Sequence, residues 1–242
     1  MLYKSFLLKE ISGIDIKYFK TAASTNAIAK EYSKTATADC VFIAKKQSGG
    51  KGRKDRAFYS PNGGVYFSLV LQKDEGDKIP TITALAAVAV KNAIKKLNSD
   101  LDPKIKWVND IYIDNKKVCG ILCEKLSNSP YTVIGIGINT ARPKNIPLEL
   151  KDIYGFINEK ASYRYNARLI AEIIKEIYLL LKTNDFYDYA NSSMCIGKEI
   201  TVIKETESFK AKAIKIDKDF SLIVEKENEL ISLSSGEISI KI

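Results

Sequence analysis

Two apolar segments flank a long, basic, glycine-rich loop, and this arrangement requires a β-sheet in the fold. The segments 40–44 and 65–71 have the composition of buried strands. Between them, Gln47-Ser-Gly-Gly-Lys-Gly-Arg-Lys-Asp-Arg-Ala-Phe-Tyr-Ser-Pro61 contains three glycines, two lysines and two arginines. Glycine lets a backbone approach a ligand, arginine offers forked donors to carboxylate and phosphate, and successive backbone N–H groups bind anions. The loop therefore predicts an anion-binding segment, with a solvated basic loop as the alternative.

Composition narrows the class of protein that can carry this loop. The chain has 242 residues, 45% of them apolar, which suits one large domain or a domain with a small appendage. No apolar run approaches the roughly 20 residues that span a bilayer, and charge comes too early at the N-terminus for a signal peptide. We therefore expect a cytoplasmic protein with no membrane contact. The absence of histidine excludes Ser-His-Asp triads, histidine acid–base catalysis and most zinc catalysis.

The formal net charge of +9 has two interpretations. A basic chain is a candidate for nucleic-acid binding. Here lysine, isoleucine, asparagine and tyrosine are all abundant, and the lysines are scattered from end to end, which favours a general composition bias. The charge by itself therefore does not predict a nucleic-acid interface.

The four cysteines do not predict a metal site. Most lie in apolar, strand-like segments, where cysteine behaves as a small hydrophobic residue, and no C-x-x-C pair occurs. In the strand predicted over 117–124, strict alternation puts one lysine and three apolar residues on the same face: Lys117, Cys119, Ile121 and Cys123. Either the lysine stem follows this surface to the strand end, or the ammonium points into a pocket.

Helix signals begin at Ser24, which is a good N-cap. Thr25 and Asn26 follow, and three polar side chains at a helix N-terminus suit a polar ligand group as well as capping. Apolar stripes predict a helix over 79–98 capped by Thr81 and another over 166–183 capped by Asn166; a short polar helix is expected around 185–192.

Further strands complete a mixed pattern. Residues 14–19 alternate like a strand, 104–110 predict a strand that ends at Asn109-Asp110, and 111–113 resume the sheet. The strand at 131–139 contains Gly135 and Gly137 on one face, and such glycines mark a bulge or the close approach of a ligand. Neither these glycines nor those of the basic loop fit a dinucleotide fingerprint or a P-loop.

The sequence period changes from Gly197 onward. Five short strands separated by turn residues suggest a small β-barrel: 198–204, 209–216, 221–225, 230–233 and 237–242. We therefore predict one domain over 1–195 and a second over 196–242.

Five blocks occur in one order at fitting spacings, and together they resemble the biotin–protein ligases. The blocks are Ser24-Thr-Asn26, Gln47-Ser-Gly-Gly-Lys-Gly-Arg53, Lys106-Trp-Val-Asn-Asp110, Lys117-Val-Cys-Gly-Ile-Leu122 and Gly135-Ile-Gly-Ile-Asn139. The resemblance runs from about residue 15 to the end. It implies an α+β fold, with a mixed β-sheet and helices packed on it as a class II synthetase-like catalytic domain, and a small SH3-like β-barrel as the C-terminal domain.

The resemblance implies a two-step ligase reaction. Biotin and ATP give biotinyl-5′-AMP and pyrophosphate with Mg²⁺, and a lysine of a biotin carboxyl carrier protein then displaces AMP. That carrier would belong to acetyl-CoA carboxylase or a related carboxylase. A carboxylate that attacks an α-phosphate needs positive charge more than a general base, which agrees with a chain without histidine. Mg²⁺ that bridges phosphates needs few protein ligands, so we expect no dedicated metal cage.

Site residues follow from the resemblance by position. The expected catalytic cations are Lys117 and Arg53. Both would also meet biotin, together with Ser24, Thr25, Asn26, Gln47, Gly50, Lys51, Gly52, Gly135 and Gly137. Both would meet the nucleotide as well, together with Arg56, Phe58, Asn109, Asp110 and Asn139. Gly135 and Gly137 would leave room for the biotin chain, and Asp110 would act through the metal.

The loop departs from the family pattern Gly-Arg-Gly-Arg-x-Gly-Arg-x-Trp at three positions. Lys51 replaces the first arginine, Asp55 the later glycine and Phe58 the tryptophan; Val108 replaces a proline elsewhere. A carboxylate at Asp55 beside bound anions is expected to point away from the site. Phe58 offers adenine a smaller stacking face than tryptophan.

Two other functions are alternatives. A lipoate–protein ligase is similar in fold and adenylation chemistry, but it typically carries a His-Asp pair, which this chain lacks. A basic nucleic-acid-binding module would bind in a strongly salt-dependent way, and it leaves Lys117 and the Gly-x-Gly strand without a role. The resemblance implies the short form of the ligases, since 23 residues before Ser24 are too few for the winged helix of some members. We expect no sequence-specific nucleic-acid binding, and a homodimer is left open.

Overall fold

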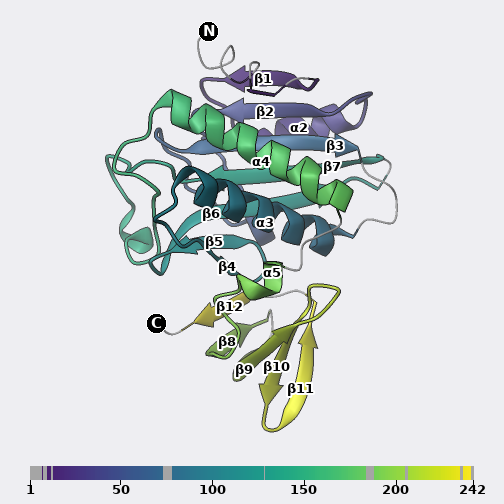
Figure 1. Cartoon of the computed structure of the whole chain (residues 1–242), viewed down its shortest axis with the longest axis vertical. Coiled ribbons are helices and arrows are strands. Elements are labelled where there is room, and N and C mark those ends of the chain that lie inside the picture. Colours follow the sequence, from purple (N-terminus) through teal and green to yellow (C-terminus); the bar gives the residue numbers. More distant parts are fainter. Residues whose placement is uncertain are drawn as a thin grey trace.

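The computed structural model contains two β-sheets, and Figure 1 shows the smaller one attached below the larger. It describes residues 7, 10, 11, 13–72, 78–127, 129–183, 188–204, 207–234 and 237–240. Within these ranges, no helix is both long and apolar enough to cross a membrane.

The larger sheet has seven strands in the order β1-β2-β3-β7-β6-β5-β4. Their bounds are β1 Asp15–Phe19, β2 Cys40–Ala44, β3 Val65–Gln72, β4 Lys104–Lys106, β5 Asp110–Ile113, β6 Lys116–Lys125 and β7 Tyr131–Ile138. β1 and β2 are parallel and the other neighbours are antiparallel, so the predicted mixed sheet is confirmed. The central pairing of β3 with β7 brings the end of the basic loop beside the Gly-x-Gly strand.

Helices cover the two faces of this sheet unequally. The helices are α2 Thr25–Ser33, α3 Ile79–Leu97, α4 Tyr163–Thr183 and α5 Asp188–Asn191. α3 and α4 lie side by side over one face, where the main apolar core forms (Figure 1). The short α2 lies on the other face against β2, β3 and β7, over a small cluster that includes Ala29, Phe42 and Val70. The rest of that second face is therefore available for a binding site.

The helix caps differ partly from the sequence predictions. Ser24 caps α2 as expected, because its hydroxyl accepts the N–H of Ala27. Thr81 is not the cap of α3: that helix begins two residues earlier, with proline in its first turn, whose fixed φ favours a helix start without a side-chain cap. Asn166 is not the cap of α4 either, because Ser162 Oγ accepts the N–H of Tyr165 and the helix begins at Tyr163.

The strand predicted over 104–110 ends early, at Lys106. The chain turns at 107–109 and returns antiparallel as β5, so that Lys106 pairs with Asp110. Apolar Trp107 and Val108 suggested a continuous strand, but they are buried in the turn itself. The turn matters for the site because it places Asn109 in the turn and Asp110 at the start of β5, where both line the cavity described below.

The smaller sheet confirms the predicted run of short C-terminal strands. It is antiparallel, in the order β11-β10-β9-β8-β12, with bounds β8 Glu199–Ile203, β9 Ser208–Ile216, β10 Leu222–Lys226, β11 Glu229–Leu233 and β12 Glu237–Ile240. Residues 241 and 242 of the last predicted strand, and 185–187 of the predicted short helix, lie outside the described residues. The domain boundary near residue 195 stays a prediction.

Candidate functional site

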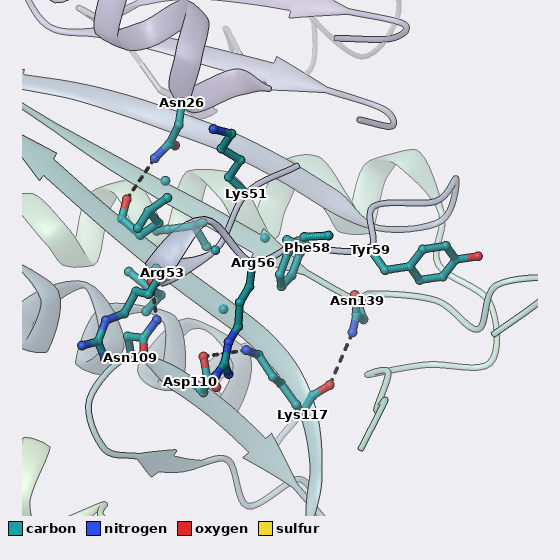
Figure 2. Close-up of a pocket in the computed structure, with 18 of the residues that line it drawn as sticks. Asn26, Lys51, Arg53, Arg56, Phe58, Tyr59, Asn109, Asp110, Lys117 and Asn139 are labelled. Atoms are coloured by element: carbon teal, nitrogen blue, oxygen red, sulfur yellow. Dashed lines mark hydrogen bonds and ion pairs between the residues drawn. The ribbon is translucent and has the colours of Figure 1, made fainter. Parts of the chain in front are cut away.

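A cavity of about 430 Å³ lies on the face of the larger sheet beside α2, with the loop 47–61 over it (Figure 2). The N-terminus of α2, the turn after β4, and strands β6 and β7 supply the other walls. It is lined by most of the predicted site residues: Ser24, Thr25, Asn26, Gln47, Lys51, Gly52, Arg53, Arg56, Phe58, Asn109, Asp110, Lys117, Gly135, Gly137 and Asn139. Segments far apart in the sequence are therefore brought to one place.

Gly50 is the predicted site residue that does not line the cavity. Its carbonyl accepts the N–H of Phe58 at 2.8 Å. A Cβ at Gly50 would lie 2.6 Å from both the Phe58 carbonyl oxygen and Ser60 Oγ, so glycine is required for the loop to close on itself. Gly50 thus shapes the loop and does not face the cavity.

The cavity floor exists because small residues face each other across neighbouring strands. Gly120 of β6 pairs with Gly137 of β7, and Gly135 of β7 pairs with Ser68 of β3. Without large side chains at these positions, the sheet surface is hollow between α2 and the loop.

The hollows over the two predicted glycines contain side chains of the protein itself. A Cβ at Gly135 would lie 1.9 Å from Asn26 Oδ1, and one at Gly137 would lie 2.3 Å from a ring carbon of Phe58. Gly135 therefore makes room for Asn26. At Gly137, a ligand would share the space with Phe58 or displace it.

Hydrogen bonds tie the polar end of the cavity together. Gln47 Oε1 accepts the backbone N–H of Thr25 at 2.8 Å and its hydroxyl at 3.1 Å. Ser68 Oγ lies 2.6 Å from Asn26 Oδ1 and 2.8 Å from the Thr25 hydroxyl, and the Gln47 amide donates to Ser60 Oγ at 3.0 Å. The buried residues at the start of α2 are thus held to both the loop and the sheet.

The other end of the cavity is cationic. Of the described residues that line the cavity, only Asp110 is acidic and five are basic: Lys51, which extends on the Asn26 side in Figure 2, and Arg53, Arg56, Lys106 and Lys117. Lys117 Nζ lies 2.8 Å from Asp110 Oδ1, and Arg53 donates to Asn109 Oδ1 at 3.4 Å. Figure 2 shows Arg56 extending from the loop toward Asp110 and Lys117. Such an excess of positive charge suits an anionic ligand.

A β-bulge turns Lys117 toward the cavity. The register between β5 and β6 shifts so that Ile111 pairs with Cys119 and Tyr112 with Lys117, which leaves Val118 as an extra residue. The prediction that Lys117 shares a face with Cys119 and Ile121 is therefore wrong. Those two residues pack in the main core, whereas Lys117 Nζ would lie 3.4 Å from a Cβ at Gly120, on the cavity face.

Asp55 points away from the cavity floor. Its side chain is 88% exposed and pairs with Lys51 at 3.1 Å. Lys54 and Asp55 have positive φ values of 54° and 55°, a backbone conformation that glycine adopts more readily. The carboxylate predicted to avoid the site thus lies in solvent.

A segment that the sequence left irregular also contributes to the cavity. Leu150, Ile153 and Tyr154 line it, and the backbone N–H of Lys117 donates to the Ile153 carbonyl at 2.7 Å. No periodicity signals this segment, because single bridges and a short 3₁₀ turn hold it in place. Ile238 of the smaller sheet reaches the cavity as well.

Asn139 leaves an unused acceptor in the cavity wall. Its amide nitrogen donates to the Gly155 carbonyl at 2.9 Å. Its Oδ1 is buried and has no hydrogen-bond partner among the described residues. A buried acceptor of this kind suits a donor on a ligand.

The thiols do not supply a nucleophile at neutral pH. Burial raises the pKa of Cys119 far above its usual range, with the nearby Asp110 carboxylate adding to the effect, and burial raises the pKa of Cys40 to about 11. No group of three or more His, Cys, Asp or Glu side chains that could hold a metal occurs within the described ranges.

Fold and site together define a class of protein: an α+β protein that binds an extended ligand, uncharged and polar at one end and anionic at the other. Comparisons with known proteins give the family. The model of the biotin/lipoate A/B protein ligase family matches residues 18–140, and that of the biotin protein ligase C-terminal domain matches residues 195–241.

Curated relatives extend over almost the whole chain. The bifunctional ligase/repressor BirA of Bacillus subtilis is 31% identical over 253 residues, which cover 97% of this chain and 76% of the relative. BirA of Escherichia coli is 23% identical, with 97% of this chain and 77% of the relative covered. The chain therefore belongs to the biotin/lipoate A/B protein ligase family, on the side of the biotin protein ligases.

Solved structures have the same fold. Biotin protein ligase from Aquifex aeolicus, in complex with biotin and ATP, gives a TM-score of 0.79 at 22% identity, covering 94% of this chain and 98% of that chain. Biotin protein ligase from Leishmania major, in complex with biotinyl-5-AMP, gives a TM-score of 0.59 at 20% identity, covering 93% and 100%. The catalytic fold and the SH3-like C-terminal domain expected from the sequence are thus confirmed.

Proposed function

We propose that this chain uses ATP to activate biotin as biotinyl-5′-AMP and then transfers biotin to a lysine of a carboxyl carrier protein. The observation that carries the proposal is a single cavity that joins a neutral hydrogen-bonding end to a cationic end. Biotin has a cyclic urea at one end and a carboxylate at the other, and ATP brings the phosphates.

The polar end offers groups that complement a cyclic urea. After the internal hydrogen bonds are counted, the Ser24 hydroxyl and one N–H of Gln47 are left to donate to a urea carbonyl. Oxygen lone pairs of Thr25 and Asn26 are left to accept urea N–H groups. The dithiolane ring of lipoate has neither N–H nor carbonyl, so it would leave these buried groups unpaired, which favours biotin over lipoate.

The cationic end is the site proposed for both chemical steps. In the first step, a carboxylate oxygen of biotin attacks the α-phosphorus of ATP, the bond to the bridging oxygen breaks, and pyrophosphate leaves. Arg53 and Lys117 are the cations that would bring the two anions together and stabilise the charge that develops between them. Lys117 has three donors, so it can keep its contact with Asp110 while it binds phosphate oxygens.

Asn139 and Phe58 are the residues proposed to meet adenine. The unpaired Asn139 Oδ1 can accept from the exocyclic amine. The Phe58 ring extends from the loop onto Gly120 of β6 and Gly137 of β7, and Lys117 Nζ lies 5.8 Å from its centroid. After it leaves the hollow at Gly137, the ring can stack on a base.

Mg²⁺ fits this site as an ion carried by the nucleotide. Asp110 is the only carboxylate among the described residues that line the cavity, and Mg²⁺ commonly uses one or two carboxylates together with substrate phosphates and water. When bound, the ion would neutralise phosphate charge. Asp110 would hold it on the side of the cavity where Lys117 lies.

In the second step, the neutral amine of the carrier lysine attacks the acyl carbon of the adenylate. The bond from that carbon to the phosphate oxygen breaks, AMP leaves with the electron pair, and the amine loses a proton to water. One relative, from Paracoccus denitrificans, is named a biotin–[acetyl-CoA-carboxylase] ligase. We infer a carrier of the same kind for this chain.

ATP–pyrophosphate exchange tests the proposal most directly. Exchange should depend on biotin and on Mg²⁺ and should be absent with lipoate in place of biotin. Exchange with lipoate alone would contradict the assignment. A DNA-binding titration over a range of salt concentrations tests the nucleic-acid alternative. That alternative predicts tight binding that weakens steeply with salt, whereas the ligase function predicts no sequence-specific binding.

A further inference from the structure

The orientation of the Asn26 amide decides what a ligand meets at the polar end of the cavity. This side chain is buried and lies flat against Gly135, in the space where other residues have a Cβ. The nitrogen and oxygen ends of an amide have nearly the same shape, so hydrogen-bond partners determine which end points where.

Two acceptors on β6 fix the nitrogen end. Asn26 Nδ2 donates to the Leu122 carbonyl at 3.1 Å, the contact drawn in Figure 2, and to Glu124 Oε2 at 3.0 Å. A carbonyl and an ionised carboxylate can only accept, so turning the amide over would place oxygen against oxygen twice. Ser68, on the other side of the amide, has a hydroxyl that can donate or accept and does not decide the orientation.

Lys30 holds the Glu124 carboxylate in place. Lys30 Nζ lies 2.9 Å from Glu124 Oε1, the oxygen that Asn26 does not use. Asn26 and Lys30 are four residues apart on α2, so they lie on the same side of the helix and reach the same carboxylate. The side chains of Lys30 and Glu124 are 38% and 29% exposed, so the ion pair is partly shielded from solvent.

We propose that Glu124, held by Lys30, is a positioning residue that keeps the Asn26 carbonyl available to the cavity and so sets the hydrogen-bond polarity with which the site recognises a cyclic urea. The inference rests on the proposed function. Glu124 does not line the cavity and would not touch biotin. It acts on the ligand only through Asn26.

The consequence for recognition follows from the two lone pairs of Asn26 Oδ1. One accepts from Ser68, and the second is left for a urea N–H. If the amide turned over, its N–H₂ would face that N–H, donor against donor. A ligand with an oxygen in place of the N–H would then be favoured instead.

Glu124→Gln is the sharpest test, because glutamine keeps the shape but can donate as well as accept. In the exchange assay, the KM for biotin should rise about tenfold, while kcat and the KM for ATP stay within about twofold, since only ground-state recognition of the urea changes. The preference for biotin over analogues with oxygen in place of one urea N–H should fall in parallel. Lys30→Met should change the KM for biotin in the same direction by a smaller factor, because the carboxylate still accepts from Asn26.

Glu31→Gln is the matched control. Glu31 lies on the same helix in an exposed ion pair with Lys34. Loss of its charge should change neither the KM for biotin nor the preference for biotin over the oxygen analogues. An unchanged KM for biotin in Glu124→Gln would overturn the inference. A fall in melting temperature with an unchanged preference among the analogues would overturn it as well, because a purely structural Lys30–Glu124 ion pair would give that result. If the unmodified chain showed no biotin-dependent exchange, the proposed function would fail and the inference with it. If the unmodified chain were active but Glu124→Gln had an unchanged KM for biotin, the inference alone would fail.

Discussion

At the scale of single residues, the proposed chemistry depends most on Lys117. Its ammonium lies on the cavity face over Gly120 and pairs with Asp110 at 2.8 Å. Lys117→Ala should lower biotin-dependent ATP–pyrophosphate exchange by about 10²- to 10³-fold, because it removes a positive charge aimed at the developing phosphate charge. Melting temperature should change little, since the side chain is not part of the apolar core.

Lys104 offers a matched control for this substitution. It forms an exposed ion pair with Asp102, two residues earlier in the chain, and exposed pairs contribute little to stability. Lys104→Ala should therefore exchange pyrophosphate at the rate of the unmodified chain to within about twofold. A fully active Lys117→Ala variant would remove Lys117 from the mechanism.

The sequence predicts which residues belong to the site, but for some of them it does not predict where the side chain points. The cap at Ser24 follows from local preference alone and is confirmed. The direction of Lys117 depends on a bulge that is visible only in the pairing of β5 with β6, because strict alternation puts it on the wrong face. The contact of Gly135 with Asn26 joins segments more than a hundred residues apart, and no local pattern signals it.

At the scale of elements, the loop 47–61 is the segment that lies over the cavity. It lies over the sheet, it carries Arg53 and Arg56 into the site, and its outer positions at Lys51, Lys54 and Asp55 are exposed (Figure 2). The two ends of the loop are held to each other, since the Gln47 N–H donates to the Ser60 carbonyl, and Gln47 Oε1 joins them to α2 by accepting the Thr25 N–H. Ligands bound beneath it would add contacts along its middle.

Limited trypsin digestion measures that change, since the loop contains four trypsin sites at Lys51, Arg53, Lys54 and Arg56. Cleavage there should slow by about tenfold or more when biotin and ATP are added together, because a loop that gains charge-assisted hydrogen bonds opens less often. Cleavage after exposed Lys34, which directly follows α2, is the internal control and should keep its rate. Equal rates at the loop with and without ligands would show that it is not a lid.

The elements themselves were mostly predictable because period and composition agree. The strands β2 and β3 and the helix α3 appear close to their expected bounds. The early end of β4 was missed, because Trp107 and Val108 have strand-like composition although they lie in a turn. The sequence does not predict that the segment around Ile153 lines the cavity. Its position depends on backbone hydrogen bonds to Lys117, and no pattern within the segment indicates them.

At the scale of the whole molecule, the two sheets meet behind the turn that carries Asn109 and Asp110. The indole N–H of Trp107 donates to the Phe220 carbonyl at 2.9 Å, and the Tyr189 hydroxyl donates to the Val108 carbonyl at 2.7 Å. The rings of Tyr189 and Phe220 pack edge to face, with centroids 5.6 Å apart. The turn is thus held from behind by residues near and within the C-terminal part of the chain.

This junction should couple the C-terminal sheet to nucleotide binding. Trp107→Phe keeps an aromatic ring but leaves the Phe220 carbonyl without its donor, which should lower the free energy of unfolding by about 1–2 kcal/mol. Because Asn109 and Asp110 lie next to Trp107, the KM for ATP should rise about three- to tenfold. The KM for biotin should stay unchanged, since the polar end of the cavity lies on α2 and the loop. Exchange kinetics with each substrate varied in turn, and urea unfolding followed by circular dichroism, measure these effects.

Tyr178→Phe separates coupling from simple loss of stability. The Tyr178 hydroxyl donates to the Asp39 carboxylate on the far side of the larger sheet, and neither residue lines the cavity. Its loss should lower the free energy of unfolding by a similar amount without changing the KM for ATP. If Trp107→Phe behaved in the same way as Tyr178→Phe, the C-terminal sheet would contribute stability to the catalytic turn but not its position. A rise in the KM for ATP in Trp107→Phe alone would mean that nucleotide binding depends on how the two sheets are joined.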